Sequence, residues 1–254
     1  MLPRARKRFG QHFLTDRHYL ERIVAAIGPR PGEAMVEIGP GTGLLTDELV
    51  RGLDHLHVVE IDRDLAAALR NRLDPAKVTV HEGDALEFDF ASLPAPLRVA
   101  GNLPYNVSTP ILFRMAGLAD RIADCTFLLQ KEVVDRMAAE PDTADYGRLS
   151  VMLQYRFGVE PLLRVPPGAF TPPPKVDSAV VRMVPLGRDR PVARDESRFA
   201  AVVAAAFSQR RKTLRNAVRA LVPDTAFPQA GIDPSRRGET LSVKEFITLS
   251  DAST

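Results

Sequence analysis

Residues 34–50 read AMVEIGPGTGLLTDELV and combine an apolar run, a glycine-rich turn and a segment with helical spacing. Ala34–Ile38 predicts a buried strand, and Leu44–Val50 predicts a helix. The turn between them contains three glycines, Gly39, Gly41 and Gly43. Because these positions lack side chains, a ligand can lie directly against the backbone. A strand, a glycine turn and a helix in this order predict a phosphate- or nucleoside-binding site in an α/β fold.

The spacing of the glycines excludes two common nucleotide-binding motifs. The dinucleotide fingerprint G-x-G-x-x-G/A fails because Leu44 or Thr46 stands at its third glycine position. No Gly-Lys-Ser/Thr follows the turn, so it is not a P-loop. The remaining pattern, G-x-G-x-G, suits a flat nucleoside with a short zwitterionic tail.

Acidic residues follow the next two predicted strands. The strand Leu56–Ile61 contains Glu60, which lies 21 residues after Gly39. An acid at about this offset grips ribose hydroxyls in nucleotide-binding α/β folds, so we expect Glu60 to bind a ribose rather than solvent. After the strand Lys77–His81, Asp84 is placed to accept a hydrogen bond from the exocyclic amine of a bound adenine. A Gly-Asp turn alone would carry no such information.

The fourth predicted strand, Leu97–Ala100, leads into the tetrapeptide Asn102-Leu103-Pro104-Tyr105. Pro104 biases Leu103 towards an extended backbone, which holds its carbonyl away from helical pairing. A carboxamide, a carbonyl and an aromatic face therefore lie at the carboxyl end of a strand, where ligands bind in open α/β sheets. By itself the tetrapeptide is also compatible with a polar strand-to-helix turn containing a partly buried tyrosine.

Composition restricts the class of protein. The chain has 254 residues, of which 45% are hydrophobic and 26% charged, as in globular proteins with a substantial core. No apolar run approaches the ~20 residues that span a membrane, and no apolar segment typical of a secretory signal follows the basic N-terminus. The single cysteine, Cys125, excludes an internal disulfide and a cysteine-based zinc site, so we expect a core residue, no metal and a cytoplasmic protein.

Strands and helices alternate through residue 140, which predicts a doubly wound, mostly parallel α/β sheet. Further segments that we expect to be regular are helices at Asp64–Leu73 and Thr109–Leu118 and strands at Cys125–Gln130, Val159–Val165 and Val176–Val184. Thr15-Asp16 offers a helix N-cap, and Leu149–Tyr155 is ambiguous between helix and strand.

The pattern changes after Pro185. Residues 188–195 are charged and resemble a linker, whereas Phe199–Phe207 and Thr213–Leu221 have helical spacing. Ser242 and Glu245 form a capping box that opens a last helix. We therefore predict two domains, a ligand-binding α/β domain at residues 1–187 and a small all-helical domain at residues 188–254.

Basic residues form two clusters on a chain whose formal net charge is only +2. Their members are Arg4, Arg6, Lys7 and Arg8 near the N-terminus and Arg210, Arg211, Lys212 and Arg215 in the helical region. Localised clusters of this kind suggest contacts with a polyanion such as RNA, although a solvated face is the commoner explanation of any one cluster.

Together these features resemble the ribosomal RNA adenine N6,N6-dimethyltransferase family. The stretches that carry the resemblance are Gly10–Leu14, Glu37–Gly43, Val59–Asp62, Gly83–Leu86, Asn102–Tyr105, Pro167–Ser178 and the run Gln209–Arg215 with Asn216. His12 stands where some members carry Asn. The resemblance implies a Rossmann-like fold, S-adenosylmethionine as cofactor, and dimethylation of two adjacent adenosines in small-subunit ribosomal RNA or a subunit precursor, coupled to subunit assembly. No coiled-coil pattern in the sequence indicates an oligomer, so we expect a monomer.

The resemblance also implies roles for individual residues. The expected catalytic residues are Asn102, Leu103, Pro104, Tyr105 and Phe170, the last stacking on the target base opposite Tyr105. The expected cofactor-binding residues are Gln11, His12, Leu14, Gly39, Gly41, Gly43, Glu60, Ile61, Asp84, Ala85 and Asn102. Oxygen acceptors around the adenine N6 suit methyl transfer to nitrogen, because they stabilise the positive charge that develops on it.

Other classes of protein share part of this pattern. A macrolide-resistance methyltransferase that modifies the large subunit has the same Asn-Leu-Pro-Tyr motif, but the stretch around Phe170 and the run Arg210–Asn216 favour the small-subunit enzyme. A DNA adenine methyltransferase is disfavoured, because such enzymes more often carry Asp-Pro-Pro-Tyr/Phe or Asn-Pro-Pro-Tyr/Phe where this chain has Asn102-Leu103-Pro104-Tyr105. A non-catalytic RNA-binding assembly factor of the same fold also remains open.

Overall fold

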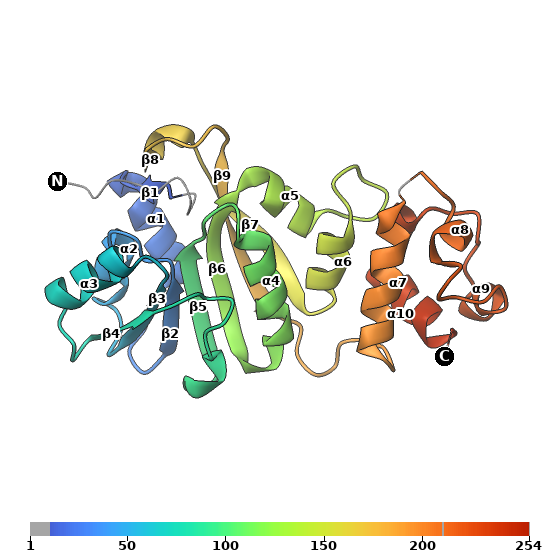
Figure 1. The fold of residues 1–254 in the computed structure, drawn as a ribbon, viewed down its shortest axis with the longest axis horizontal. Helices are drawn as coiled ribbons and strands as arrows, with labels where there is room; N and C mark the ends of the chain where they lie inside the picture. Colours follow the sequence, from blue (N-terminus) through green and yellow to red (C-terminus); the bar gives the residue numbers. More distant parts are fainter. Residues whose placement is uncertain (1–10, 210, 254) are drawn as a thin grey trace. The chain divides into compact units, whose positions relative to one another are not determined.

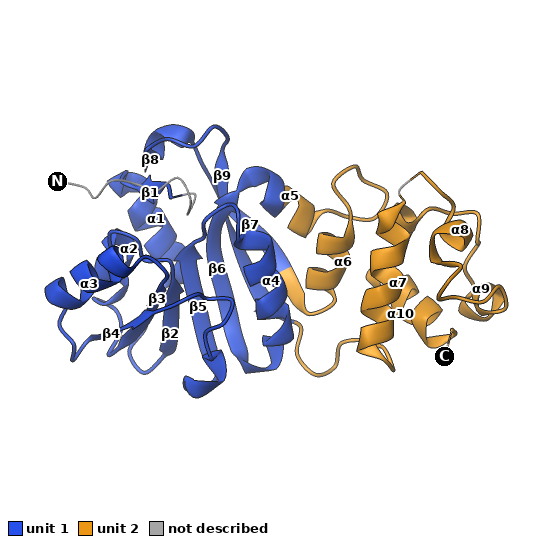
Figure 2. Cartoon of the chain, viewed as in Figure 1, with its two compact units in different colours: residues 1–134, 159–185 blue, residues 135–158, 186–254 orange. Residues whose placement is uncertain are grey.

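The structure, a computed structural model, describes residues 11–209 and 211–253 (Figure 1). The chain forms two compact units (Figure 2). The first unit extends to Val134 and resumes from Val159 to Pro185; the second contains Asp135–Gly158 and the chain from Leu186 onward. The predicted boundary at residue 187 therefore lies close to Pro185, but the prediction placed residues 135–158 in the other unit.

Packing explains why this inserted segment belongs to the second unit. Tyr146, Val151 and Tyr155 are buried in one hydrophobic core with Phe199 and Phe246. Aromatic and aliphatic side chains dominate the energetics of such a core, so the segment joins the unit that buries them. The sequence pattern did not reveal this partner because the two parts are separated by the strands of the first unit.

The first unit is built around a seven-stranded sheet with the order β4-β3-β2-β5-β6-β9-β7. Its elements, of which α5 and β7 extend into the second unit, are β1 (Phe13–Leu14), α1 (Arg17–Ile27), β2 (Ala34–Ile38), α2 (Leu44–Leu49), β3 (Leu56–Glu60), α3 (Arg63–Arg72), β4 (Val78–Glu82), β5 (Leu97–Asn102), α4 (Ser108–Gly117), β6 (Ile122–Gln130), α5 (Lys131–Ala138), β7 (Phe157–Val165), β8 (Phe170–Thr171) and β9 (Ser178–Pro185).

The predicted doubly wound, mostly parallel sheet is confirmed. Strands β4, β3, β2, β5 and β6 pair in parallel, whereas β9 is antiparallel to β6. Parallel strands are covered on both faces and read as continuous apolar runs, and in β2 the consecutive residues Met35 and Val36, which point to opposite faces, are both buried. Cys125 in β6 is completely buried, as expected for a core residue.

The second unit is helical apart from the first two residues of β7, Phe157 and Gly158. Its remaining helices are α6 (Arg148–Gln154), α7 (Glu196–Ser208), α8 (Leu214–Val218), α9 (Ala226–Ala230) and α10 (Val243–Asp251). The ambiguous segment Leu149–Tyr155 is thus part of a helix. The capping box at Ser242 is confirmed, because its hydroxyl accepts from the Glu245 N–H while the Glu245 carboxylate accepts from the Ser242 N–H.

A short antiparallel ladder fixes the N-terminal segment of the first unit. Leu14 of β1 pairs with Phe170 of β8, and the Thr15 N–H donates to the Ala169 carbonyl at 2.9 Å. The next helix, α1, then begins at the expected cap, where Asp16 accepts from two backbone N–H groups. We call residues Gln11–Leu14 the N-terminal strap. Within the described residues, no helix has the length and apolar character needed to span a membrane.

Candidate active site

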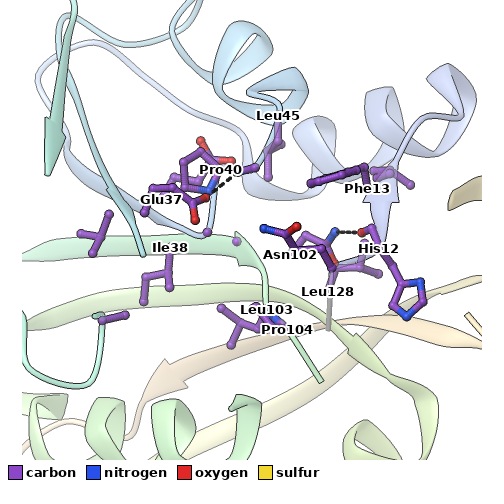
Figure 3. Close-up of a pocket in the computed structure, with 18 of the residues that line it drawn as sticks. His12, Phe13, Glu37, Ile38, Pro40, Leu45, Asn102, Leu103, Pro104 and Leu128 are labelled. Atoms are coloured by element: carbon purple, nitrogen blue, oxygen red, sulfur yellow. Dashed lines mark hydrogen bonds between the residues drawn. The ribbon is translucent and has the colours of Figure 1, made fainter. Parts of the chain in front are cut away.

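A pocket opens where the carboxyl ends of β2, β3, β4 and β5 meet the N-terminal strap (Figure 3). The empty volume of the pocket, including the part that is open to solvent, is about 1240 Å³. The predicted site residues that line it are Gln11, His12, Leu14, Gly39, Gly41, Glu60, Ile61, Asp84, Ala85, Asn102, Leu103, Pro104 and Tyr105. The fold therefore brings together segments that are up to 94 residues apart in sequence (11 to 105).

Two predicted site residues do not line the pocket. Gly43 is the N-cap of α2 with a φ of 83°, a left-handed conformation that favours glycine, and a Cβ there would lie 2.2 Å from Arg72 Nη2 and 2.7 Å from Leu69 Cδ2. Phe170 is only 3% exposed and packs in the core with Leu14 and Val180. Pairing of β8 with β1 turns its ring inward, and in this structure Phe170 does not present a face to a base.

The remaining glycines of the turn form the upper rim of the pocket. Gly41 has a φ of 58°, and a Cβ there would come within 3.1 Å of the Phe13 ring. Any larger residue would therefore be strained and would press against the N-terminal strap. The glycine turn and the strap form one wall because Gly41 permits this close approach.

Glu60 connects two loops at the rim. One carboxylate oxygen accepts from the Gly41 N–H at 3.0 Å, and the other accepts from the Asp62 N–H at 2.9 Å. The side chain is 3% exposed, and burial raises its pKa while these N–H donors lower it. Each oxygen retains a lone pair, so the carboxylate can still accept from ligand hydroxyls.

Glu37 is a pocket residue that the sequence analysis did not single out. It is 1% exposed in β2, and the Thr46 hydroxyl donates to its carboxyl at 2.6 Å. Burial raises the pKa of Glu37 to about 8, with smaller contributions from the nearby Glu60 and Asp47 carboxylates. Its carboxyl is therefore largely protonated at neutral pH. The signal was present in the sequence as a charged residue inside the apolar run AMVEI.

Asn102 lies at the end of β5 with its side chain held by the strap. Its Nδ2 donates to the backbone carbonyl of His12 at 2.8 Å (Figure 3). Because a carbonyl can only accept, this partner fixes the orientation of the amide and leaves Oδ1 as the acceptor for a ligand. The next residue, Leu103, is buried, and the Pro104 carbonyl accepts from the Val107 N–H at 3.1 Å.

Tyr105 is held at both ends of its side chain. Its phenol oxygen hydrogen-bonds with the Ser178 hydroxyl at 2.6 Å, and its ring stacks on the His12 imidazole with 5.4 Å between centroids. The His12 Nδ1 in turn lies 2.8 Å from the Pro172 carbonyl. Burial raises the pKa of Tyr105, so the phenol stays neutral and acts by stacking and hydrogen bonding.

The basic residues are only partly described. Arg4, Arg6, Lys7, Arg8 and Arg210 lie outside the described residues. Arg211 and Lys212 are exposed between α7 and α8, and Arg215 in α8 forms an ion pair with Asp224. Within residues 11–209 and 211–253, no three His, Cys, Asp or Glu side chains are grouped as metal ligands.

The fold and the pocket together define a class of protein. A glycine turn follows a central strand, an acid follows the next strand, and an Asn-Leu-Pro-Tyr segment follows β5; these are features of a Rossmann-like, S-adenosylmethionine-dependent methyltransferase. The sequence model of one family, described as ribosomal RNA adenine dimethylase, matches residues 3–254. The chain belongs to this family.

Two bacterial proteins are similar in sequence to nearly the whole chain. The ribosomal RNA small subunit methyltransferase A of Aromatoleum aromaticum is 61% identical over 98% of this chain and 94% of its own. The protein of the same name from Laribacter hongkongensis is 58% identical over 97% and 95%.

Solved structures support the fold. A dimethyladenosine transferase from Plasmodium falciparum aligns with a TM-score of 0.78 at 23% identity, over 94% of this chain and 96% of its own. The 23S rRNA methyltransferase ErmE aligns with a TM-score of 0.71 at 28% identity, over 95% and 99%. The architecture of this chain is therefore shared with a 23S rRNA methyltransferase.

Proposed function

We propose that this protein transfers methyl groups from S-adenosylmethionine to the N6 atoms of two adjacent adenosines in small-subunit ribosomal RNA. The relatives that carry a small-subunit name, at 61% and 58% identity, support this substrate over the large subunit. The observation that supports this chemistry is the orientation of the Asn102 side chain. Its Nδ2 donates to the His12 carbonyl, so its Oδ1 can accept a hydrogen bond from the substrate.

The residues of the pocket fit S-adenosylmethionine, which supplies an electrophilic methyl group on its sulfonium when bound. The Glu60 carboxylate has lone pairs available for the two ribose hydroxyls. The Asp84 carboxylate uses one oxygen to accept from the Leu86 N–H, and its other oxygen can accept from the adenine amine. Ile61, an apolar side chain that is 44% exposed, offers a surface to the adenine ring. The amino-acid end then lies between the glycine turn and the strap.

The chain's own contribution to methyl transfer is to align and activate the adenine nitrogen. The N6 lone pair is delocalised into the ring, so the free amine is a poor nucleophile. The Asn102 Oδ1 and the carbonyl of Leu103 or Pro104 accept its two N–H groups; the Pro104 carbonyl, which accepts from the Val107 N–H, keeps a second lone pair. These acceptors favour a tetrahedral nitrogen and stabilise the positive charge that develops on it. For the second methyl, one acceptor contact is released.

The target base must leave its stack to reach this pocket. Tyr105 offers a stacking surface, and base stacking on an aromatic ring contributes about 1–3 kcal/mol. Phe170 would join as the second face only after moving out of the core. The first unit thus acts as the catalytic domain, and the helical unit holds the RNA through Arg211 and Lys212, together with the basic residues outside the described ranges. We place this activity in the cytoplasm, in a monomer that acts during subunit assembly.

The test is methylation with tritiated S-adenosylmethionine of small subunits that lack the dimethylated adenosines, beside large subunits and plain DNA. Wild type and Asn102→Ala are compared, and the RNA is digested to nucleosides. We expect dimethyladenosine only in small-subunit RNA, lost in the variant. Label in the large subunit would assign the resistance-type activity instead. Subunit binding without any label would leave a non-catalytic assembly factor.

A further inference from the structure

Thr126 is a buried polar residue of the pocket that the proposed function leaves without a role. Its side chain is 3% exposed in β6, and it lines the pocket. Within the described residues, its hydroxyl has no hydrogen-bond partner. A buried hydroxyl without a partner destabilises a fold, and valine would fill the same space in a strand. The threonine therefore points to a partner that is supplied by a ligand.

Strand register places Thr126 opposite a second buried polar group. Glu37 on β2 pairs with Ala100 on β5, and Ala100 pairs with Thr126 on β6. Paired residues of neighbouring strands point to the same face, so these three side chains form a row across the sheet. Neighbouring strands lie about 4.8 Å apart, so the Cα atoms of Glu37 and Thr126 are about 10 Å apart. Only the methyl group of Ala100 lies between the Glu37 carboxyl and the Thr126 hydroxyl in this row.

The row faces the side of the sheet that carries the strap. Ala100 and Leu128, which lies two residues after Thr126, pack in one core with Leu14 and Leu20. The residues proposed to hold the adenosine follow β3 and β4, which are separated from β6 in the sheet by β2 and β5. A cofactor with its adenosine over β3 and β4 extends its amino-acid end over β2, β5 and β6, above Thr126.

We propose that Thr126 is a positioning residue for the amino-acid end of S-adenosylmethionine. Its hydroxyl and the Glu37 carboxyl together hold one ordered water above Ala100, and this water accepts a hydrogen bond from the cofactor's ammonium group. An ammonium group has three N–H donors and no acceptor, and the apolar side chains of Leu14, Leu20 and Ile23 in the same pocket offer it no acceptor. The inference rests on the proposed function, because it requires S-adenosylmethionine to be the cofactor.

Two ligands separate this role from general packing. S-Adenosylhomocysteine carries the amino-acid end, and 5′-methylthioadenosine lacks it. Calorimetric titration of Thr126→Val should show roughly tenfold weaker binding of S-adenosylhomocysteine, the effect of one hydrogen bond in a charged network, and unchanged binding of 5′-methylthioadenosine. Thr126→Ser retains the hydroxyl and should bind both ligands within about twofold of wild type.

The second unit offers a matched control. Ser250 is the other buried hydroxyl side chain without a partner among the described residues, and Ser250→Ala should leave both affinities unchanged. Thermal unfolding establishes that each variant is folded. The inference, but not the proposed function, would be overturned if Thr126→Val bound S-adenosylhomocysteine as tightly as wild type does. The same holds if the variant lost equal affinity for both ligands. If wild type binds neither ligand, the proposed cofactor is wrong and the inference falls with it.

Discussion

The amide nitrogen of Asn102 donates to the backbone carbonyl of His12 across 2.8 Å, so the N-terminal strap sets the direction in which the Asn102 Oδ1 points. The bond uses the main chain of His12, and its strength does not depend on the side chain at that position. The position of the strap and the orientation of the Asn102 side chain therefore depend on each other, although His12 and Asn102 are 90 residues apart in sequence.

The first prediction concerns this bond. Asn102→Asp keeps an oxygen in the pocket but cannot donate, and its carboxylate faces the His12 carbonyl, so the acceptor is displaced. We expect kcat to fall by about 10²–10³, the usual effect of losing one preorganised group that stabilises charge. His12→Ala retains the carbonyl and should preserve most of kcat. Activity of Asn102→Asp within tenfold of wild type would contradict the proposed orientation.

The second prediction concerns Tyr105. Tyr105→Ala removes the stacking surface and should raise KM for the RNA by about 5- to 150-fold, whereas Tyr105→Phe retains it. Tyr105→Phe loses the bond to Ser178 and should cost about 1 kcal/mol of stability. Ser178→Ala should reproduce that loss. Equal KM values for the Ala and Phe variants in steady-state assays would exclude stacking.

The third prediction follows from the protonated carboxyl of Glu37. Its pKa is about 8 in the folded protein and 4.5 in the reference state, so between these values the unfolded chain loses the proton while the folded chain keeps it. Stability of the ligand-free protein therefore falls as pH rises through this window, by at most about 1.4 kcal/mol per pH unit from this residue.

Glu37→Gln removes that titration and still accepts from the Thr46 hydroxyl. Urea unfolding from pH 5 to pH 8 should show the Gln variant gaining stability over wild type as pH rises. A difference in unfolding free energy that is constant across this range would mean that Glu37 is already ionised in the folded protein.

The fourth prediction distinguishes the basic side chains of the helical unit. Arg211 and Lys212 are exposed, whereas Arg215 is engaged with Asp224. Replacing Arg211 and Lys212 together by Ala should weaken RNA binding and reduce the slope of log affinity against log salt by roughly 1–2. Arg215→Ala should change that slope less, because its charge is already paired. Filter binding at several salt concentrations measures both, and equal slopes for the two variants would refute the distinction.

Local patterns in the sequence identified those parts of the site that lie within one strand and its loop. The glycine turn, Glu60, Asp84 and Asn102 each follow a strand directly, and parallel pairing brings the ends of these strands to one edge. Their meeting was predictable because the hydrophobic period and the turn residues specify a parallel sheet. Asp16 as the N-cap of α1 was predictable for the same local reason.

Contacts between distant segments were not predictable in this way. The inward position of Phe170 depends on pairing of β8 with β1, about 157 residues earlier in the chain, and no local pattern encodes that partner. The position of Gly43 outside the pocket lining was not predictable either, because spacing alone does not distinguish a glycine needed for a left-handed helix N-cap from one that faces a pocket. Glu37 was overlooked because a charged residue within an apolar strand reveals its burial only when its neighbours are known.

The ladder between β1 and β8 also bears on the order in which the protein matures during its synthesis. A nascent chain that has emerged as far as β6 contains the glycine turn, Glu60, Asp84 and Asn102, but Phe170 and Thr171, which hold the strap, have not yet been added. Domains form as their contacts become available, and this ladder joins segments that are about 157 residues apart. The strap can therefore be fixed only after roughly two-thirds of the chain has been translated, long after Asn102.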